Sequence, residues 1–143
     1  MEYLNKKAKF NYRLDGEVEA GISLEGSEAK AIREQGINLS NSFVKIIGNE
    51  AFLINADISI PGKKDYNSTR TRKLLLKKEE ILSFSLSAKA KSLTIVPVKL
   101  YNKGRFYKVK LALGKPRKKF EKKEAIKKRD IEREIDKQLK DNS

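Results

Sequence analysis

The chain has 143 residues, with 33 Lys and Arg against 19 Asp and Glu and a formal net charge of +14. Positive charge of this size favours a polyanionic partner, either a nucleic acid or an anionic membrane surface. The chain has no Cys and no His, which excludes disulfides, thiolate or imidazole metal sites and Ser-His-Asp catalysis. We therefore expect no metal, no cofactor and no enzymatic activity. No apolar run approaches the ~20 residues of a membrane span, and no signal-peptide core is visible, so we expect a cytoplasmic protein.

The first half of the chain predicts strands with one short helix between them. Apolar residues alternate with polar ones in a pattern typical of a half-buried strand at Val18, Ala20, Ile22 and Leu24. Ser27 can cap a helix that ends at Gly36. Residues 43–47 and 50–58, joined by Gly48-Asn49, indicate a β-hairpin with a tight turn.

The second half predicts one helix and a second hairpin. The three leucines at 74–76 fit helical spacing with Ile81 and Leu86, so we expect a helix from this segment to about Ala90. Strands are expected at 93–101 and 105–113. Short antiparallel strands of this number usually close into a barrel or sandwich, because closure removes exposed edges. We predict a mainly β fold, a small OB-like antiparallel barrel over residues 1–113 with one to three short helices.

Residues 114–143 form a basic tail with 12 Lys and Arg against 7 Asp and Glu. On a helical wheel its large apolar residues share roughly 100° of arc: Phe120, Ile131, Ile135 and Leu139. Side-chain pairs worth only ~0.2–0.5 kcal/mol each cannot hold such a helix in water. We therefore expect a tail that is disordered when free and helical when bound to a partner. A membrane-surface helix is the main alternative, but the apolar stripe is thin and the charges alternate, which favours RNA.

Three segments combine cations with groups suited to RNA. Residues 67–73 interleave cations with hydroxyls at the predicted start of a helix, although an ordinary capped helix would look the same. Basic residues precede Phe10 and Tyr12, whose rings can stack on unpaired bases or form the core face of a first strand. The core position is favoured, because the chain has few apolar residues to fill its interior. Lys108 and Lys110 share one face of a strand. This face can contact phosphates, or it can be the ordinary solvent-exposed side of a strand.

Taken in order, these segments resemble the SsrA-binding protein family, the bacterial partners of transfer-messenger RNA. The matching segments are 5–8, 19–22, 24–30, 50–53, 69–76 and 101–110. The block Thr69-Arg70-Thr71-Arg72-Lys73 with its three leucines is the specific one. The resemblance implies an OB-fold barrel that binds the tRNA-like domain of transfer-messenger RNA and delivers it to stalled ribosomes for trans-translation. It also implies an indirect partnership with elongation factor Tu. The tail would sense the empty mRNA channel beside the decoding centre.

The patterns and the resemblance together assign residues to each task. Glu28 matches the family's acidic RNA-contacting residue. The expected RNA-binding residues are Phe10, Tyr12, Glu28, Lys30, Arg33, Arg70, Arg72, Lys73, Lys77, Lys108 and Lys110. The expected ribosome-binding residues of the tail are Lys115, Arg117, Lys118, Lys119, Phe120, Glu121, Lys122, Lys123, Ile126 and Arg129.

Three positions depart from the family pattern. Phe10 stands where the family usually has His, Lys77 where many members have Asn or His, and Pro116 where a flexible Gly precedes the tail. We expect a monomer with no membrane partner. The alternative function is a ribosomal or ribosome-assembly protein with a generic basic extension. A nuclease is disfavoured, because His and a clustered acidic metal site are missing.

Overall fold

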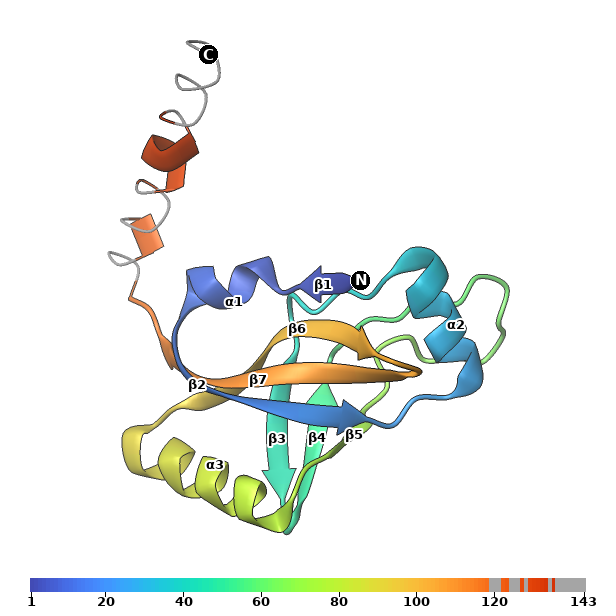
Figure 1. The fold of residues 1–143 in the computed structure, drawn as a ribbon, viewed down its shortest axis with the longest axis horizontal. Coiled ribbons are helices and arrows are strands. Elements are labelled where there is room, and N and C mark those ends of the chain that lie inside the picture. The colour runs from blue at the N-terminus through green and yellow to red at the C-terminus, as the bar shows by residue number, and fades with distance from the viewer. Residues whose placement is uncertain (119–121, 124–126, 128, 134, 136–143) are drawn as a thin grey trace.

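The computed structural model describes residues 1–118, 122, 123, 127, 129–133 and 135. Figure 1 shows the elements in chain order, and the strands outnumber the helices, as predicted. The helices before the tail are α1 (Lys6–Asn11), α2 (Gly26–Gln35) and α3 (Lys78–Lys91). The strands are β1 (Glu2–Leu4), β2 (Tyr12–Ile22), β3 (Phe43–Ile47), β4 (Glu50–Ile54), β5 (Arg72–Leu75), β6 (Thr94–Lys103) and β7 (Phe106–Pro116).

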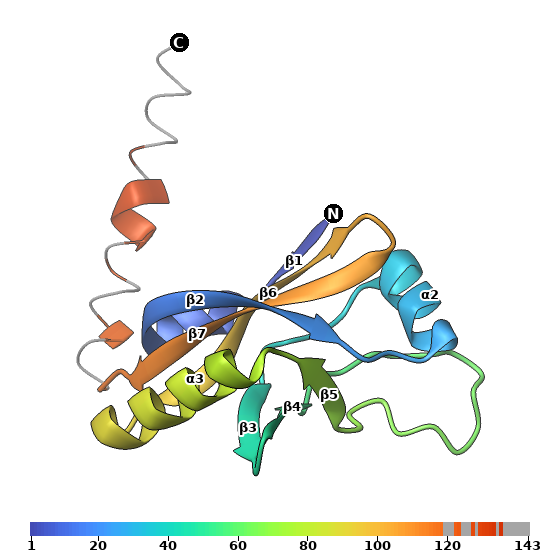
Figure 2. The same cartoon turned by 60° about the horizontal axis from the view of Figure 1, so that its bottom comes forward.

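The strands form a closed antiparallel barrel, which confirms the predicted fold class. They pair in the order β1-β6-β3-β4-β5-β2-β7, and an additional pairing of β6 with β7 closes the barrel. Short β1 pairs with the end of β6, where Glu2 lies opposite Tyr101. Figures 1 and 2 show α2 and α3 at opposite ends of this barrel, with α1 beside the start of β2. Closure leaves few strand edges unpaired, as expected for a small β domain.

The barrel interior is filled by inward side chains at every second strand position. Leu53, Leu74, Leu100 and Val109 are fully or almost fully buried, and Ile32 of α2 closes one end. Both predicted hairpins are present, with β3 paired to β4 and β6 paired to β7. The predicted helix is α2, but its N-cap is Glu25 and not Ser27, which lies inside the first turn. Gly36 ends the helix with a φ of 87°, a conformation that suits glycine.

The segment of residues 69–76 differs most from its prediction. The structure places Arg72–Leu75 in strand β5, and α3 begins only at Lys78. Burial alternates along β5, so that Arg72 and Leu74 point inward while Lys73 and Leu75 point outward. The run of leucines therefore belongs to a two-sided strand, and the helical spacing with Ile81 was misleading.

The structure adds detail at both ends of the barrel. Phe10 lies in helix α1 rather than on a first strand, and Tyr12 is the first residue of β2. Strand β7 continues to Pro116, so it crosses the predicted boundary between barrel and tail at residue 114. Pro116 pairs with Tyr12 at the end of the β2–β7 ladder. This position tolerates proline because a strand end can lack one ladder hydrogen bond.

The described residues beyond Lys118 are helical. Ile131 and Ile135 of the predicted stripe are 51% and 50% exposed. Phe120 and Leu139 lie outside the described residues. Among the residues that the structure describes, no helix is long and apolar enough to cross a membrane.

Candidate nucleic-acid interface

One groove collects several of the predicted RNA-binding residues. It has a volume of about 630 Å³ and lies over strands β2, β5 and β7, next to the start of α3. We call it the β5 groove. Its lining residues are Glu19, Gly21, Asn49, Glu50, Lys73, Leu74, Leu75, Leu76, Lys77, Lys78, Glu80, Ile81 and Lys108.

Gly21 forms the floor of the β5 groove. It pairs with Leu75 on one neighbouring strand and with Lys108 on the other, so these two side chains flank it on the same face. A Cβ atom at Gly21 would lie 3.2 Å from the Cβ of Leu75, so the glycine lets the leucine lie over the strand. Leu75 is nevertheless 57% exposed. Its position offers an apolar platform against which a base or sugar can pack.

Cations surround this platform. Lys73 forms a salt bridge of 3.1 Å with Glu50, both on exposed surface. Within the described part of the chain, Lys77, Lys78 and Lys108 form no salt bridge with a carboxylate. Their charges are therefore available for phosphate groups. The groove thus combines an apolar centre with a rim of four lysines and three carboxylates, those of Glu19, Glu50 and Glu80.

Glu19 adds a hydrogen-bond acceptor to the groove. Its carboxylate accepts a hydrogen bond from the Tyr101 hydroxyl and lies 3.6 Å from the Nζ of Lys103. The hydrogen bond from Tyr101 lowers the pKa of Glu19. Burial, together with this bond, raises the pKa of Tyr101 to about 12. At neutral pH Glu19 is a charged acceptor that can receive a hydrogen bond from a base or a 2′-hydroxyl.

The predicted residues Glu28, Arg70 and Arg72 meet elsewhere, in a second cluster. Glu28 of α2 and Arg72 of β5 are completely buried. The Arg72 Nη2 lies 2.7 Å from a Glu28 oxygen, and Arg70 also donates to both Glu28 oxygens. The Tyr66 hydroxyl donates to Glu28 at 2.9 Å. We call these four residues the Glu28 clamp.

The clamp keeps Glu28 ionised. Burial raises the pKa of Glu28, but the hydrogen bonds from Arg70, the Glu25 backbone, Arg72 and Tyr66 outweigh it and lower the pKa to about 2. Since Glu28 and Arg72 are buried, they can support RNA binding only by holding other groups in place, not by touching RNA in this conformation. Arg70 is 31% exposed at its side chain, so part of its guanidinium reaches the surface. The RNA-binding role assigned to the three residues from sequence stays a prediction.

Lys30 and Arg33 lie on the exposed side of α2, away from its buried residues Glu28, Ala31 and Ile32. They line neither the β5 groove nor the N-terminal groove described next. The structure therefore does not bring them together with Lys73, Lys77 and Lys108.

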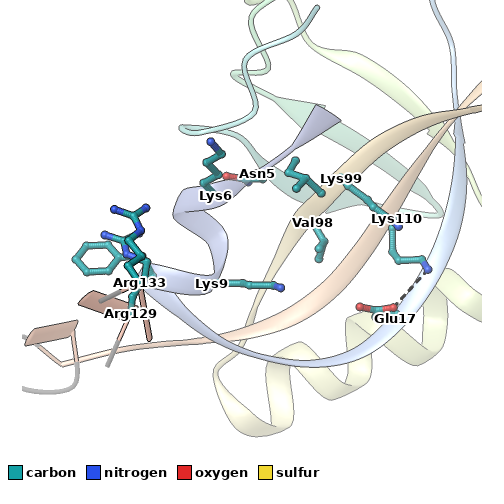
Figure 3. Close-up of a pocket in the computed structure, with 11 residues that line it drawn as sticks. Asn5, Lys6, Lys9, Glu17, Val98, Lys99, Lys110, Arg129 and Arg133 are labelled. Carbon is teal, nitrogen blue, oxygen red and sulfur yellow. Dashed lines mark ion pairs between the residues drawn. The ribbon is translucent and has the colours of Figure 1, made fainter. Parts of the chain in front are cut away.

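A second basic groove lies between α1, strands β6 and β7, and the tail. It has a volume of about 530 Å³, and we call it the N-terminal groove. Figure 3 shows Lys6 and Lys9 projecting from α1, with Arg129 and Arg133 of the tail nearby. Its other lining residues are Leu4, Asn5, Phe10, Glu17, Val98, Lys99 and Lys110. Cations predominate here, so this groove also suits an anion.

Phe10, Tyr12 and Lys110 were predicted to contact RNA from this region. Phe10 is half-buried, and the ammonium of Lys122 lies 5.9 Å from its ring centre. Tyr12 is half-buried over Gly114, where an added Cβ would lie 3.0 Å from the tyrosine ring. Lys110 forms an ion pair of 3.5 Å with Glu17, drawn in Figure 3. Packing thus occupies one face of Tyr12, while Phe10 and Lys110 border an open groove.

The base of the tail is attached to the barrel. The backbone N–H of Arg117 donates to the Asn11 carbonyl at 2.9 Å, and its Nε donates to the Tyr12 carbonyl at 3.3 Å. Lys115, Lys118 and Lys123 are exposed. Lys119, Phe120, Glu121 and Ile126 were predicted to bind the ribosome and lie outside the described residues.

Of the residues that line the β5 groove, only Lys73, Lys77 and Lys108 were predicted from sequence to bind RNA. Leu75 was assigned to a helix, while Glu19 and Gly21 were only members of the matching segment 19–22. A glycine inside a strand pattern is the one available signal, because it often marks a close approach by another group. Among the described residues, no cluster of three or more acidic side chains could hold a metal ion.

Comparison with known proteins places this geometry in a family. The family profile described as SmpB protein matches residues 3–141. The SsrA-binding protein of Persephonella marina is 46% identical over 139 residues, covering 95% of this chain and 91% of its own. That of Mesoplasma florum is 48% identical over 137 residues, covering 91% and 90%.

A solved structure agrees. It is described as "tmRNA-SmpB: a journey to the center of the bacterial ribosome", and one of its chains is 34% identical, with a TM-score of 0.68. The match covers 82% of this chain and 85% of that chain. The chain therefore belongs to the SmpB protein family.

Proposed function

We propose that this chain binds the tRNA-like domain of transfer-messenger RNA with its barrel and delivers that RNA to stalled ribosomes for trans-translation. The observation that carries the proposal is the β5 groove, in which Lys73, Lys77 and Lys108 surround the exposed Leu75. Cations of this kind neutralise phosphates, and an apolar side chain packs on a base or a sugar. Family membership and the similarity to a chain of a tmRNA-SmpB structure support the same assignment.

The tail has a separate task in this proposal. It enters the empty mRNA channel beside the decoding centre, so that only a ribosome with a vacant channel accepts the RNA. Its attachment through Arg117 starts it from a defined point on the barrel. Elongation factor Tu is a partner only through the shared RNA. The protein acts as a cytoplasmic monomer without catalysis.

RNA binding tests the first half of the proposal. We expect the wild-type chain to bind a folded tRNA-like RNA more tightly than an unrelated folded RNA of equal length, in anisotropy titrations at several salt concentrations. Lys108→Ala should weaken binding and reduce the salt slope by about one. Lys45→Ala is the control, because Lys45 is an exposed strand lysine outside both grooves. Equal affinity for the two RNAs would contradict the proposal.

Deletion of residues 120–143 tests the division of labour. The shortened chain should keep its affinity for the tRNA-like RNA and lose tagging of nascent chains on stalled ribosomes in a reconstituted translation reaction. A loss of RNA affinity as large as that of Lys108→Ala would contradict this assignment. Stoichiometric co-sedimentation with ribosomal subunits in the absence of transfer-messenger RNA would instead favour a ribosomal or ribosome-assembly protein.

A further inference from the structure

Strand β5 is short and is held to its neighbours by few backbone pairs. It has four residues, of which two pair with β2 and three pair with β4. Its outward residues Lys73 and Leu75 line the β5 groove, while Arg72 and Leu74 point inward. Because side chains alternate along a strand, a slip of one residue would turn Lys73 and Leu75 into the barrel. The register of β5 therefore decides whether the groove exists.

Arg72 fixes this register, because in this register every nitrogen of its buried guanidinium donates a hydrogen bond. Its Nε donates to Glu28 at 3.0 Å, and its Nη2 donates to Glu28 and to the Ser68 carbonyl. Its Nη1 donates to the Ala56 carbonyl. A buried guanidinium without such partners is strongly disfavoured, so Arg72 acts as a pin at the first residue of β5.

Glu28 supplies the counter-charge for this pin from a separate element. It lies in α2, which is anchored by the buried Ala31 and Ile32. Its Oε1 also accepts the Glu25 backbone N–H at 2.9 Å, which orients the carboxylate at the start of the helix. The clamp also holds the long connection from β4 to β5, because Tyr66 and Ser68 belong to that loop. The position of Arg72 is therefore set by its hydrogen bonds to Glu28 of α2, as well as by the short pairings of β5 with β2 and β4.

We infer that Glu28 is a positioning residue for RNA binding, which acts by holding Arg72 and thereby the outward placement of Lys73 and Leu75 in the β5 groove. The inference rests on the proposed function, since it takes the β5 groove as an RNA-binding surface. It differs from the sequence prediction that Glu28 contacts RNA. The two assignments predict different behaviour of β5 itself.

The test uses the full-length chain with Glu28→Gln, which keeps the size of the side chain and removes its charge. The control is Glu34→Gln, a change at an exposed residue of the same helix. Hydrogen exchange at the β5 amides and affinity for the tRNA-like RNA are measured for both. We expect faster exchange in β5 and roughly tenfold weaker binding for Glu28→Gln, as for the loss of one good contact. The control should match the wild type in both.

A double-mutant cycle with Leu75→Ala separates the two assignments. If Glu28 acts through β5, the two substitutions act on the same contact, and the second adds little once the first is made. Additive losses of affinity with unchanged β5 exchange would mean direct contact and would overturn the inference. Faster exchange without any loss of affinity would also overturn it.

If Glu28→Gln does not fold by circular dichroism, Tyr66→Phe removes only the hydroxyl that bonds Glu28 and Arg72 and should give the same pattern at smaller size. Wild-type exchange in Tyr66→Phe would then count against the inference. If the wild type does not prefer the tRNA-like RNA, the proposed function fails, while β5 exchange in Glu28→Gln still reports on the clamp.

Discussion

Acidification should weaken the protein through the Glu28 clamp by an amount that the structure allows us to work out. Glu28 has an ordinary pKa of 4.5 and a folded pKa of about 2. This lowering means that the ionised form stabilises the fold, fully above the unfolded pKa and progressively less as the pH falls through the folded one. The difference corresponds to about 3 kcal/mol of the free energy of unfolding. We expect nearly all of it to be lost between about pH 6 and about pH 2.

The measurement is urea unfolding of wild type and Glu28→Gln across that pH range. Other carboxylates also titrate there, and the hydrogen bond from Tyr101 lowers the pKa of Glu19, so the wild type alone would not isolate Glu28. These groups are common to both proteins and cancel in the difference. The stability advantage of the wild type should therefore shrink by about 3 kcal/mol on acidification. A difference that stays constant with pH would refute the reasoning, because Glu28 would then titrate alike in the folded and unfolded chains.

Three other substitutions test the barrel, the groove and the tail separately. Leu100→Ala, at a fully buried core position, should lower the free energy of unfolding by about 2–5 kcal/mol in urea titrations, and a loss well under that would mean a looser core. Gly21→Val should displace Leu75 and weaken binding of the tRNA-like RNA in anisotropy titrations, because even a Cβ would approach that leucine to 3.2 Å; unchanged binding would exclude Leu75 as a contact. Arg117→Ala should leave RNA affinity unchanged and reduce tagging on stalled ribosomes, because it removes the Nε bond to Tyr12; normal tagging would show that this anchor does not direct the tail.

The strands were predictable from sequence where one face meets the core and the other meets solvent. Alternation identified β2, since period 2 is a direct consequence of strand geometry, and the tight turn at Gly48-Asn49 identified the first hairpin. Strand β5 could not be found in this way. Leu75 is apolar yet exposed, and Arg72 is charged yet buried, so hydrophobicity along β5 does not report which side faces the core. Three consecutive leucines followed by Ile81 satisfied a helical period instead.

The candidate site was predictable as a set of charges but not as a surface. Lys73, Lys77 and Lys108 were identified one by one, and the barrel brings them to one groove through the pairing of β2 with β5 and β7. Glu28 was assigned to RNA contact by the family resemblance and Arg72 by its place in the basic block, but the structure buries both. Their pairing spans 44 residues of sequence, a separation that composition and periodicity do not reveal.

Strand β5 explains why basic and apolar residues are mixed in the segment of residues 69–76. Its inward positions serve the fold, with Arg72 in the Glu28 clamp and Leu74 in the core. Its outward positions serve the groove, with Lys73 on the rim and Leu75 at the apolar centre. Strand β5 has only two inward and two outward residues, so none of them can replace a neighbour that faces the other way. Replacing Arg72 by an apolar residue could stabilise the interior only if the charge of Glu28 were removed as well, because either charge left alone would be buried without a partner. We therefore expect stability and RNA binding to be coupled at this strand, so that substitutions on its inner face affect binding without touching the RNA.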